Sequence, residues 1–279
     1  YSGAEKEVAD FALKHGLPMA ETIAGKGAVT HDHPAHVGPI GVVGSSSANE
    51  MAGAADVIIA IGTRLQDFTT GSWTVFAHDA QFVSINAARY DATKHRALAV
   101  VGDAKETVAE LKAGLSGWKA DAAWTAKGKT AFKGWNALLD EHQKLNNEPV
   151  PTYAQVVNVV NAAAGEKDTL IAAAGGIPGE VAKGWRVKAP NTFDLEFGFS
   201  CMGYEIAGAI GVKMAEPKRE VIVMVGDGSY LMMNSELATS ILLGVKLTVI
   251  LLDNRGFGCI NRLQRATGGE SFNNLLEHT

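Results

Sequence analysis

The sequence has only two cysteines, Cys201 and Cys259, among its 279 residues. Two cysteines do not make a disulfide framework, so we expect a reducing, cytoplasmic location. We expect both to be buried packing residues and not nucleophiles. A basic excess is also missing, because 25 Lys and Arg stand against 30 Asp and Glu and give a net charge of −5. This balance disfavours a nucleic-acid partner held by phosphate contacts.

Long apolar runs are absent as well. The longest, such as 221–225 and 247–252, are far shorter than the roughly 20 residues that span a bilayer, so we expect no membrane partner. There are only 8 prolines and the glycines have no period of three, which excludes a collagen-like chain. A hydrophobic content of 47% excludes disorder as a description of the whole chain.

Signals for hydrolytic triads are lacking too. There is no Gly-x-Ser-x-Gly motif, and residues 143–277 contain no histidine, so the second half has no imidazole base. Residues 123–130 match a relaxed phosphate-loop pattern, but they have helical character and follow no strand. The histidines at 31, 33 and 36 have no cysteine partner and no spaced second half, so we interpret them as a polar loop and not a metal cluster.

Short apolar strands that alternate with helices predict an α/β fold with two parallel-sheet, three-layer domains. We predict a central Rossmann-like domain over 1–115, a helical connector over 116–150 and a second α/β domain over 151–279. The predicted strands are 56–62, 82–86, 97–102, 169–174, 220–225 and 246–252; the predicted helices are 46–54, 104–115, 153–164, 201–215 and 234–243.

Two polar motifs follow neighbouring strands of the second domain. Gly226-Asp227-Gly228 comes after strand 220–225 and Asp253-Asn254 after strand 246–252, with one predicted helix between them. The carboxyl ends of parallel strands meet at one sheet edge, so we expect Asp227 and Asn254 to lie side by side. Their oxygens, with the carbonyl of Gly256, suit Mg²⁺ that is shared with a diphosphate. A tight turn and an unrelated Asp-Asn loop are the alternative interpretation.

The glycines around these ligands could let backbone approach a phosphate, and Ser229 could donate to its oxygens. The run GDGSYLMMNSELATSILLGVKLTVILLDNRGFG, residues 226–258, resembles the cofactor motif of thiamine-diphosphate-dependent enzymes. That motif closes with Asn-Asn, whereas this sequence has Asp253 at the first of these positions. The resemblance implies a thiamine diphosphate site with Mg²⁺ bound by Asp227, Asn254 and the Gly256 carbonyl.

A second segment, FGFSCMGYEIAGAIGVKMA at 197–215, is similar to the family segment that runs under the cofactor. The resemblance implies that Met202 wedges the cofactor into its bent shape while Cys201 and Gly203 face the aminopyrimidine. The turn at Gly175 and Gly176 corresponds to one that touches the diphosphate. The full set of implied cofactor-binding residues is Gly175, Gly176, Cys201, Met202, Gly203, Gly226, Asp227, Gly228, Ser229, Asn254 and Gly256.

Within the family, residues 197–215 and 253–264 are most similar to the hydrolases that open a trihydroxylated cyclohexane-1,2-dione in inositol catabolism. This implies a small cyclic diketone substrate, cleavage of a ring C–C bond and a homo-oligomer. The resemblance places the activating glutamate on an N-terminal pyrimidine-binding domain of a partner subunit, outside these residues, which implies a dimer or tetramer. This chain is therefore expected to hold no catalytic residue and to be inactive alone. Two alternatives stay open: an acetolactate-synthase-like carboligase or 2-oxo-acid decarboxylase, and a non-catalytic nucleotide- or flavin-binding module.

Overall fold

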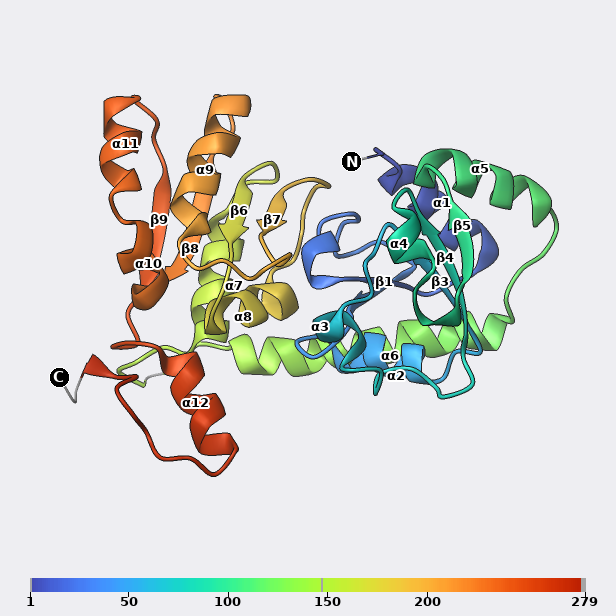
Figure 1. The fold of residues 1–279 in the computed structure, drawn as a ribbon, viewed down its shortest axis with the longest axis horizontal. Coiled ribbons are helices and arrows are strands. Elements are labelled where there is room, and N and C mark those ends of the chain that lie inside the picture. Colours follow the sequence, from blue (N-terminus) through green and yellow to red (C-terminus); the bar gives the residue numbers. More distant parts are fainter. Residues whose placement is uncertain (1, 147, 277–279) are drawn as a thin grey trace. The chain divides into compact units, whose positions relative to one another are not determined.

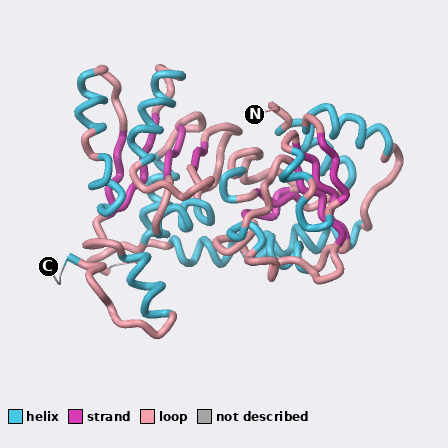
Figure 2. Tube along the Cα trace, in the orientation of Figure 1, coloured by secondary structure: helices cyan, strands magenta, loops and turns pink. Residues whose placement is uncertain are grey.

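The chain forms two compact units, Tyr1–His142 and Gln143–Thr279, in a computed structural model (Figure 1). The structure describes residues 2–146 and 148–276. The parts of the domain predictions that fall on residues 1, 147 and 277–279 lie outside the described residues. Both units are built from parallel strands and helices (Figure 2), so the predicted α/β class is confirmed.

The first unit contains two parallel sheets. Strands β3 (Val57–Ile61), β4 (Gln81–Asn86) and β5 (Leu98–Val101) pair in the order β3-β4-β5 and confirm the three predicted strands. Strands β1 (Met19–Glu21) and β2 (His36–Pro39) form a second, two-stranded parallel sheet that was not predicted. Strands of three and four residues are too short to show a hydrophobic period.

Helices flank these sheets. The apolar side chains of β3 and β4 join a buried cluster that contains Ala60, Phe82 and Phe76, and burying each large side chain stabilises the unit by about 1.5–3 kcal/mol. The helices are α1 (Glu5–His15), α2 (Ser46–Gly53), α3 (Asp67–Thr70), α4 (Arg89–Ala92) and α5 (Ala104–Gly114), with 3₁₀ turns η1 (Ile23–Gly25) and η2 (Lys94–Arg96).

Helix α6 (Ala122–Gln143) occupies most of the predicted connector and packs on the first unit. The hydroxyl of Thr125 donates to the carbonyl of Gly16 at 2.6 Å, and His31 shares a hydrogen bond with Asn136 at 3.0 Å. The units therefore divide after His142, whereas the sequence placed the boundary near residue 150. The phosphate-loop-like run 123–130 lies inside this helix, as its helical character predicted.

The second unit has one four-stranded parallel sheet in the order β7-β6-β8-β9. Its strands are β6 (Thr169–Ala172), β7 (Phe193–Leu195), β8 (Val221–Gly226) and β9 (Thr248–Leu252). Its helices are α7 (Tyr153–Ala163), α8 (Gly176–Gly184), α9 (Tyr204–Ala215), α10 (Asp227–Met233), α11 (Glu236–Leu242) and α12 (Gly258–Ala266).

Strand β8 is the centre of this unit. Val221, Val223 and Val225 pack in one cluster with Ile206 and Ile210 of α9. Because side chains alternate along a strand, the other residues of β8 face the opposite side of the sheet. A strand buried on both faces needs a continuous apolar run, which is why this segment was predictable.

The second unit differs from the prediction in several elements, since β7, α8 and α12 were not predicted. Two helices, α10 and α11, join β8 to β9 where one was expected. The predicted helix 201–215 begins only at Tyr204, because Gly203 has a φ of 93° and cannot continue a right-handed helix. In the described part of the chain, none of the helices has the length and apolarity needed to cross a membrane.

Candidate functional site

The carboxylate of Asp227 joins the two predicted motifs of the second unit. Asp227 follows β8 directly, opens α10 and is 9% exposed. Its Oδ2 accepts a hydrogen bond from the N–H of Gly256 at 2.7 Å, and its Oδ1 accepts one from the N–H of Asn254 at 3.4 Å. The expected Gly-Asp-Gly turn is thus the first turn of a helix, where a carboxylate is favoured by the helix dipole.

The amide of Asn254 and the carbonyl of Gly256 lie beside this carboxylate. One end of the amide lies 3.2 Å from Oδ1 of Asp227 and 2.6 Å from the carbonyl oxygen of Gly256: as Nδ2 it donates to both, and as Oδ1 it adds a third oxygen to theirs. The other end of the amide lies 2.5 Å from the hydroxyl of Tyr153, which can accept or donate. Acceptors that face one another repel unless a cation lies among them or the amide rotates. Oxygens about 3 Å apart are the spacing of neighbouring ligands around a Mg²⁺-sized ion.

The loop that carries Gly256 is held in place by the segment 274–276. The N–H of Phe257 donates to the carbonyl of Asn274 at 2.7 Å, and the N–H of Leu276 donates to the carbonyl of Arg255 at 2.8 Å. Gly256 has a φ of 134°, and a Cβ there would overlap the backbone of Asn274. Only glycine suits this position, and its carbonyl is thereby aimed at Asn254.

The predicted glycines lie close to these ligands. Gly226 ends β8, and a Cβ there would touch Ile177 of α8 at 3.7 Å. Gly228 lies in the first turn of α10, where a Cβ would meet the ring of Phe257 at 2.8 Å. Gly175 and Gly176 form the start of α8. The amino ends of α8 and α10, both suited to anions, therefore lie at the same edge of the sheet.

Ser229 faces the protein interior. Its hydroxyl lies 2.7 and 2.8 Å from the two oxygens of Glu205, and it accepts a hydrogen bond from the N–H of Gly203 at 2.8 Å. Ser229 is 2% exposed and Glu205 is 1% exposed. The proton of Ser229 is thus engaged by Glu205 and not by an outside ligand.

Glu205 was not predicted from the sequence. Burial raises the pKa of its carboxyl, and this effect outweighs the hydrogen bonds from Ser229 and from the N–H groups of Gly203 and neighbouring backbone. The signal that could have found it is a lone acidic residue inside the apolar, glycine-rich run 197–215. Acidic side chains are almost never fully buried unless they are paired.

The loop before α9 carries Cys201 and Met202. Cys201 is exposed and Cys259 is partly exposed, so the expectation that both are buried is wrong. The N–H of Cys201 donates to Glu196 at 2.7 Å. Desolvation and the hydrogen bond with Glu196 raise the pKa of the Cys201 thiol, which disfavours a thiolate nucleophile. The terminal methyl of Met202 lies against α10, 3.6 Å from a Cβ placed on Gly228.

Tyr153 was missed altogether. It opens α7, about a hundred residues before its partner Asn254 in the chain, and its ring lies against Gly176. Nothing in the local sequence marks a tyrosine at a helix start as a neighbour of a distant asparagine. The contact is produced by the tertiary fold.

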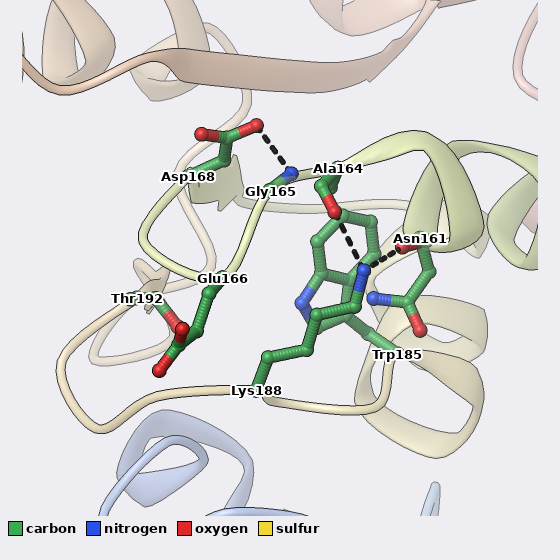
Figure 3. Close-up of a pocket in the computed structure, with 8 residues that line it drawn as sticks. All are labelled: Asn161, Ala164, Gly165, Glu166, Asp168, Trp185, Lys188 and Thr192. Carbon is green, nitrogen blue, oxygen red and sulfur yellow. Dashed lines mark hydrogen bonds between the residues drawn. The ribbon is translucent and has the colours of Figure 1, made fainter.

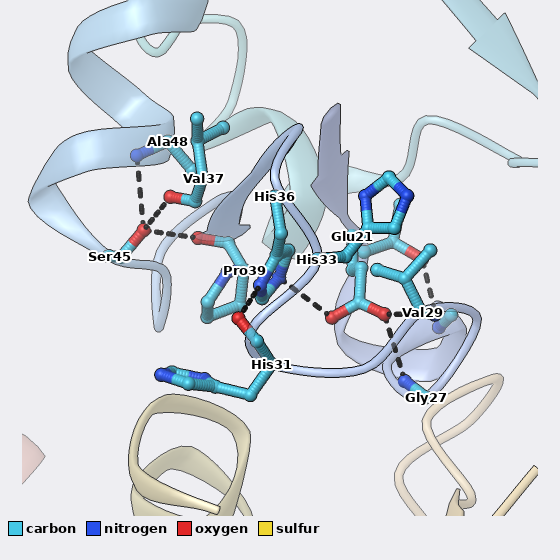
Figure 4. A network of polar contacts seen from close by, with 12 residues as sticks. Glu21, Gly27, Val29, His31, His33, His36, Val37, Pro39, Ser45 and Ala48 are labelled. Carbon is cyan, nitrogen blue, oxygen red and sulfur yellow. Dashed lines mark hydrogen bonds and ion pairs between the residues drawn. The ribbon is translucent and has the colours of Figure 1, made fainter. Parts of the chain in front are cut away.

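In the first unit His36 joins a polar network around the carboxylate of Glu21 and also contacts the carbonyl of His31 (Figure 4). Glu21 accepts from the N–H groups of Gly27 and Val29 at 3.0 and 3.3 Å and lies 3.1 Å from Nε2 of His36. Burial alone would raise the pKa of Glu21, but the interactions with His36 and Lys26 lower it overall. Among the described residues no His, Cys, Asp and Glu form a group of three that could hold a metal.

A second polar cluster, at the end of α7, does not form a ligand site (Figure 3). The ammonium of Lys188 donates to the carbonyls of Asn161 and Ala164 at 2.7 and 2.6 Å. These are terminal carbonyls of α7, so Lys188 acts as a cap for that helix. The cluster encloses essentially no free volume.

Comparison with known proteins gives two family matches. Residues 1–111 match the thiamine pyrophosphate enzyme central domain, and residues 173–278 match the C-terminal thiamine-pyrophosphate-binding domain of the same enzymes. The second match contains Asp227, Asn254 and Gly256. Thiamine pyrophosphate and thiamine diphosphate are the same cofactor.

Three curated relatives share one name. The chain is 39% identical over 98% of its length to 3D-(3,5/4)-trihydroxycyclohexane-1,2-dione hydrolase 2 of Bacillus cereus. It is 40% identical to the hydrolase of that name from Geobacillus thermodenitrificans and 38% identical to one from Bacillus anthracis. In each case the chain spans 46% of the relative, about half of its length.

Proposed function

Because the chain belongs to the thiamine pyrophosphate enzymes, we propose that its second unit binds the diphosphate of thiamine diphosphate through Mg²⁺. The observation that carries the proposal is that the carboxylate of Asp227, the amide of Asn254 and the carbonyl of Gly256 meet at the carboxyl ends of β8 and β9. One carboxylate, one amide and one carbonyl leave room for phosphate and water to complete an octahedron.

The residues of this chain would bind and orient the cofactor. The amino ends of α8 and α10 would present backbone N–H groups to the diphosphate. Beside Gly175 the space is open, since a Cβ there would meet nothing within 4 Å, so the backbone at this turn could be approached closely. We propose that Met202 supports the bent cofactor and that the backbone of Cys201 and Gly203 faces its aminopyrimidine. When bound, the cofactor supplies a nucleophilic carbon that can attack a carbonyl and accept electrons from a breaking C–C bond.

We propose further that the full protein hydrolyses 3D-(3,5/4)-trihydroxycyclohexane-1,2-dione to 5-deoxyglucuronate, as a homo-oligomer in the cytoplasm. The support is the name shared by the relatives at 38–40% identity. The activating glutamate would come from a pyrimidine-binding domain outside these residues, in a partner subunit.

Asp227→Ala tests the cofactor site. Removing the carboxylate takes away the charged metal ligand. Affinity for Mg²⁺ should therefore fall by more than about 100-fold, which is the most that losing a residue that only orients a metal ligand usually costs. Calorimetry with thiamine diphosphate and Mg²⁺, on the full-length protein, measures this. Asp168→Ala, a carboxylate at the opposite end of β6, serves as the control. Unchanged cofactor affinity in Asp227→Ala would show that the site assignment is wrong.

The substrate is tested separately. The full-length protein with cofactor should remove the absorbance of the cyclic dione and should release no carbon dioxide from pyruvate. Carbon dioxide release would instead support a 2-oxo-acid decarboxylase or an acetolactate-synthase-like carboligase. Binding of thiamine diphosphate with neither reaction would contradict the hydrolase proposal and leave the cofactor site standing.

A further inference from the structure

We propose that Glu205 is a positioning residue for the cofactor, because its buried carboxyl ties the loop 201–203 to the helix that opens at Asp227. The inference rests on the thiamine diphosphate site proposed above. Its basis is a set of hydrogen bonds that joins Glu205, Ser229 and the backbone of Gly203. The bonds that involve Ser229 span 24 and 26 residues of sequence, so they connect separate elements.

The N–H of Gly203 is shared between two acceptors. It donates to Oε2 of Glu205 at 3.0 Å and to the hydroxyl oxygen of Ser229 at 2.8 Å. The hydroxyl of Ser229 lies 2.7 and 2.8 Å from the two carboxyl oxygens of Glu205, so its own proton is directed at that carboxyl. Ser229 lies in the first turn of α10, two residues after Asp227. The carboxyl thus holds the loop against the helix that bears the proposed cation ligand.

The loop lies directly on α10. Gly203 has a φ of 93°, and a Cβ there would lie 2.6 Å from Cγ of Met233, the last residue of α10. Both observations call for glycine, which has no side chain to overlap the helix and adopts a positive φ without strain. The loop is therefore held on the helix by a backbone N–H, whose acceptors are Glu205 and Ser229.

A second carboxylate, Glu196, holds the other end of the same loop. It accepts hydrogen bonds from the N–H groups of Phe199 at 3.0 Å and of Cys201 at 2.7 Å. Met202 thus lies between two N–H groups that are each bonded to a glutamate. The bonds to Glu196 stay within one stretch of chain, whereas Glu205 also reaches α10 through Ser229. Glu205 is therefore the anchor that relates Met202 to the cation site.

The chemistry of the carboxyl separates two substitutions. Glu205 is 1% exposed, and a buried polar group is costly unless it is hydrogen-bonded. Alanine removes the acceptor that both Gly203 and Ser229 use. Glutamine keeps an acceptor for the N–H of Gly203 and adds a donor for the hydroxyl oxygen of Ser229. The tie should therefore be lost in Glu205→Ala and kept in Glu205→Gln.

Glu205→Ala tests the tie in the full-length protein at saturating Mg²⁺. By calorimetry, the Kd for thiamine diphosphate should rise about tenfold, on the scale of one lost buried hydrogen bond. The Kd for inorganic pyrophosphate should stay at the wild-type value, because the contacts proposed for the diphosphate do not include the loop 201–203. Glu205→Gln should bind both ligands like the wild type. An equal loss for both ligands in Glu205→Ala would overturn the proposal.

Val157→Ala controls for a loss of stability. Val157 is a fully buried residue of α7 and lies near Gly184, the last residue of α8 and thus at the opposite end of that helix from Gly176. Deleting its methyl groups should lower the free energy of unfolding and leave both Kd values unchanged. If Val157→Ala raised the Kd for thiamine diphosphate as much as Glu205→Ala does, stability and not position would set the affinity, and the proposal would be refuted.

Ser229→Ala breaks the tie from its other side and provides the test if Glu205→Ala does not fold. It should also raise the Kd for thiamine diphosphate and leave that for pyrophosphate unchanged. In the double variant the two effects should not add, because both residues belong to one hydrogen-bond network. Fully additive effects would contradict a shared role.

The two proposals fail in different ways. If Glu205→Ala and Ser229→Ala bind thiamine diphosphate like the wild type while Asp227→Ala does not bind it, the role of Glu205 is refuted and the cofactor site stands. If Asp227→Ala also binds it like the wild type, the cofactor site itself is refuted.

Discussion

Single residues decide which atoms face the proposed cofactor. Asp227 and Asn254 were placed together because each directly follows a strand, and the structure brings their side chains to within 3.2 Å. Ser229 follows the same strand, yet it faces Glu205 and not the outside. Consecutive residues of a helix point in directions about 100° apart, so closeness in sequence to Asp227 did not determine the role of Ser229.

Glu205 makes a testable contribution to pH dependence. Because burial raises its pKa in the folded state, the folded state holds more protons than the unfolded state at pH values between the ordinary and the raised pKa. The free energy of unfolding should therefore fall as pH rises through that window. In Glu205→Gln this decline should be absent, as urea unfolding at a series of pH values will measure.

Glu110→Gln is the matched control for Glu205→Gln. Glu110 is an exposed residue of α5, so the variant loses the same charge with no buried network. If the pH curves of Glu205→Gln and wild type run parallel, Glu205 is not the source of the decline. Glu205→Ala should lower the free energy of unfolding by about 1–3 kcal/mol more than Glu205→Gln does, since it leaves Ser229 and the N–H of Gly203 without this partner.

At the scale of elements, helix ends position the site. Helix α7 begins with a capping box, α8 begins at Gly176, and α10 begins at Asp227. Each start presents N–H groups or a side chain toward the same sheet edge. The predicted turns at Gly175 and Gly226 are therefore the entries to helices, which explains how backbone donors are directed at an anion.

Thr152→Ala tests the cap of α7. The variant removes the hydroxyl that accepts from the N–H of Gln155, so the free energy of unfolding should fall by about 1 kcal/mol. Chemical denaturation of the full-length protein measures it. Thr130→Ala, at an exposed position inside α6, makes the same change without a cap and should be neutral or slightly stabilising. Equal losses in both variants would contradict the capping role.

At the scale of the whole molecule, the two units have different expected roles. The proposed cation ligands, the helix starts and Tyr153 all belong to residues 143–279, whereas the first unit holds the buried Glu21–His36 pair. Adding thiamine diphosphate with Mg²⁺ should thus stabilise the second unit directly. At 100 times the Kd, mass action adds about 2.7 kcal/mol to the free energy of its unfolding.

Hydrogen exchange on the full-length protein checks that expectation. With cofactor and Mg²⁺, exchange should slow in α8, α10 and the loop after β9. The central strands β3 to β5 should exchange as before. Asp227→Ala should show no slowing at any of these elements. Equal protection of both units would contradict a site confined to the second one.

The sequence predicted the elements better than their boundaries. Strands β3, β4 and β5 of the first unit and β6, β8 and β9 of the second were predicted because continuous apolar runs mark buried parallel strands. Strand β7, with three residues, was missed. The two-stranded sheet β1–β2 was missed because its strands are too short to show a period. The structure divides after His142, whereas the predicted boundary lay near residue 150, since only packing shows that α6 belongs to the first unit.

The sequence by itself determined the α/β class and the placement of Asp227 beside Asn254 at one edge of the sheet. Both follow from local rules: apolar runs form strands, and parallel strands end at one edge. Only the tertiary structure decided that Tyr153 contacts Asn254, that Ser229 faces Glu205 and that Cys201 is exposed. These outcomes depend on side-chain direction between segments distant in the chain, which no local pattern encodes.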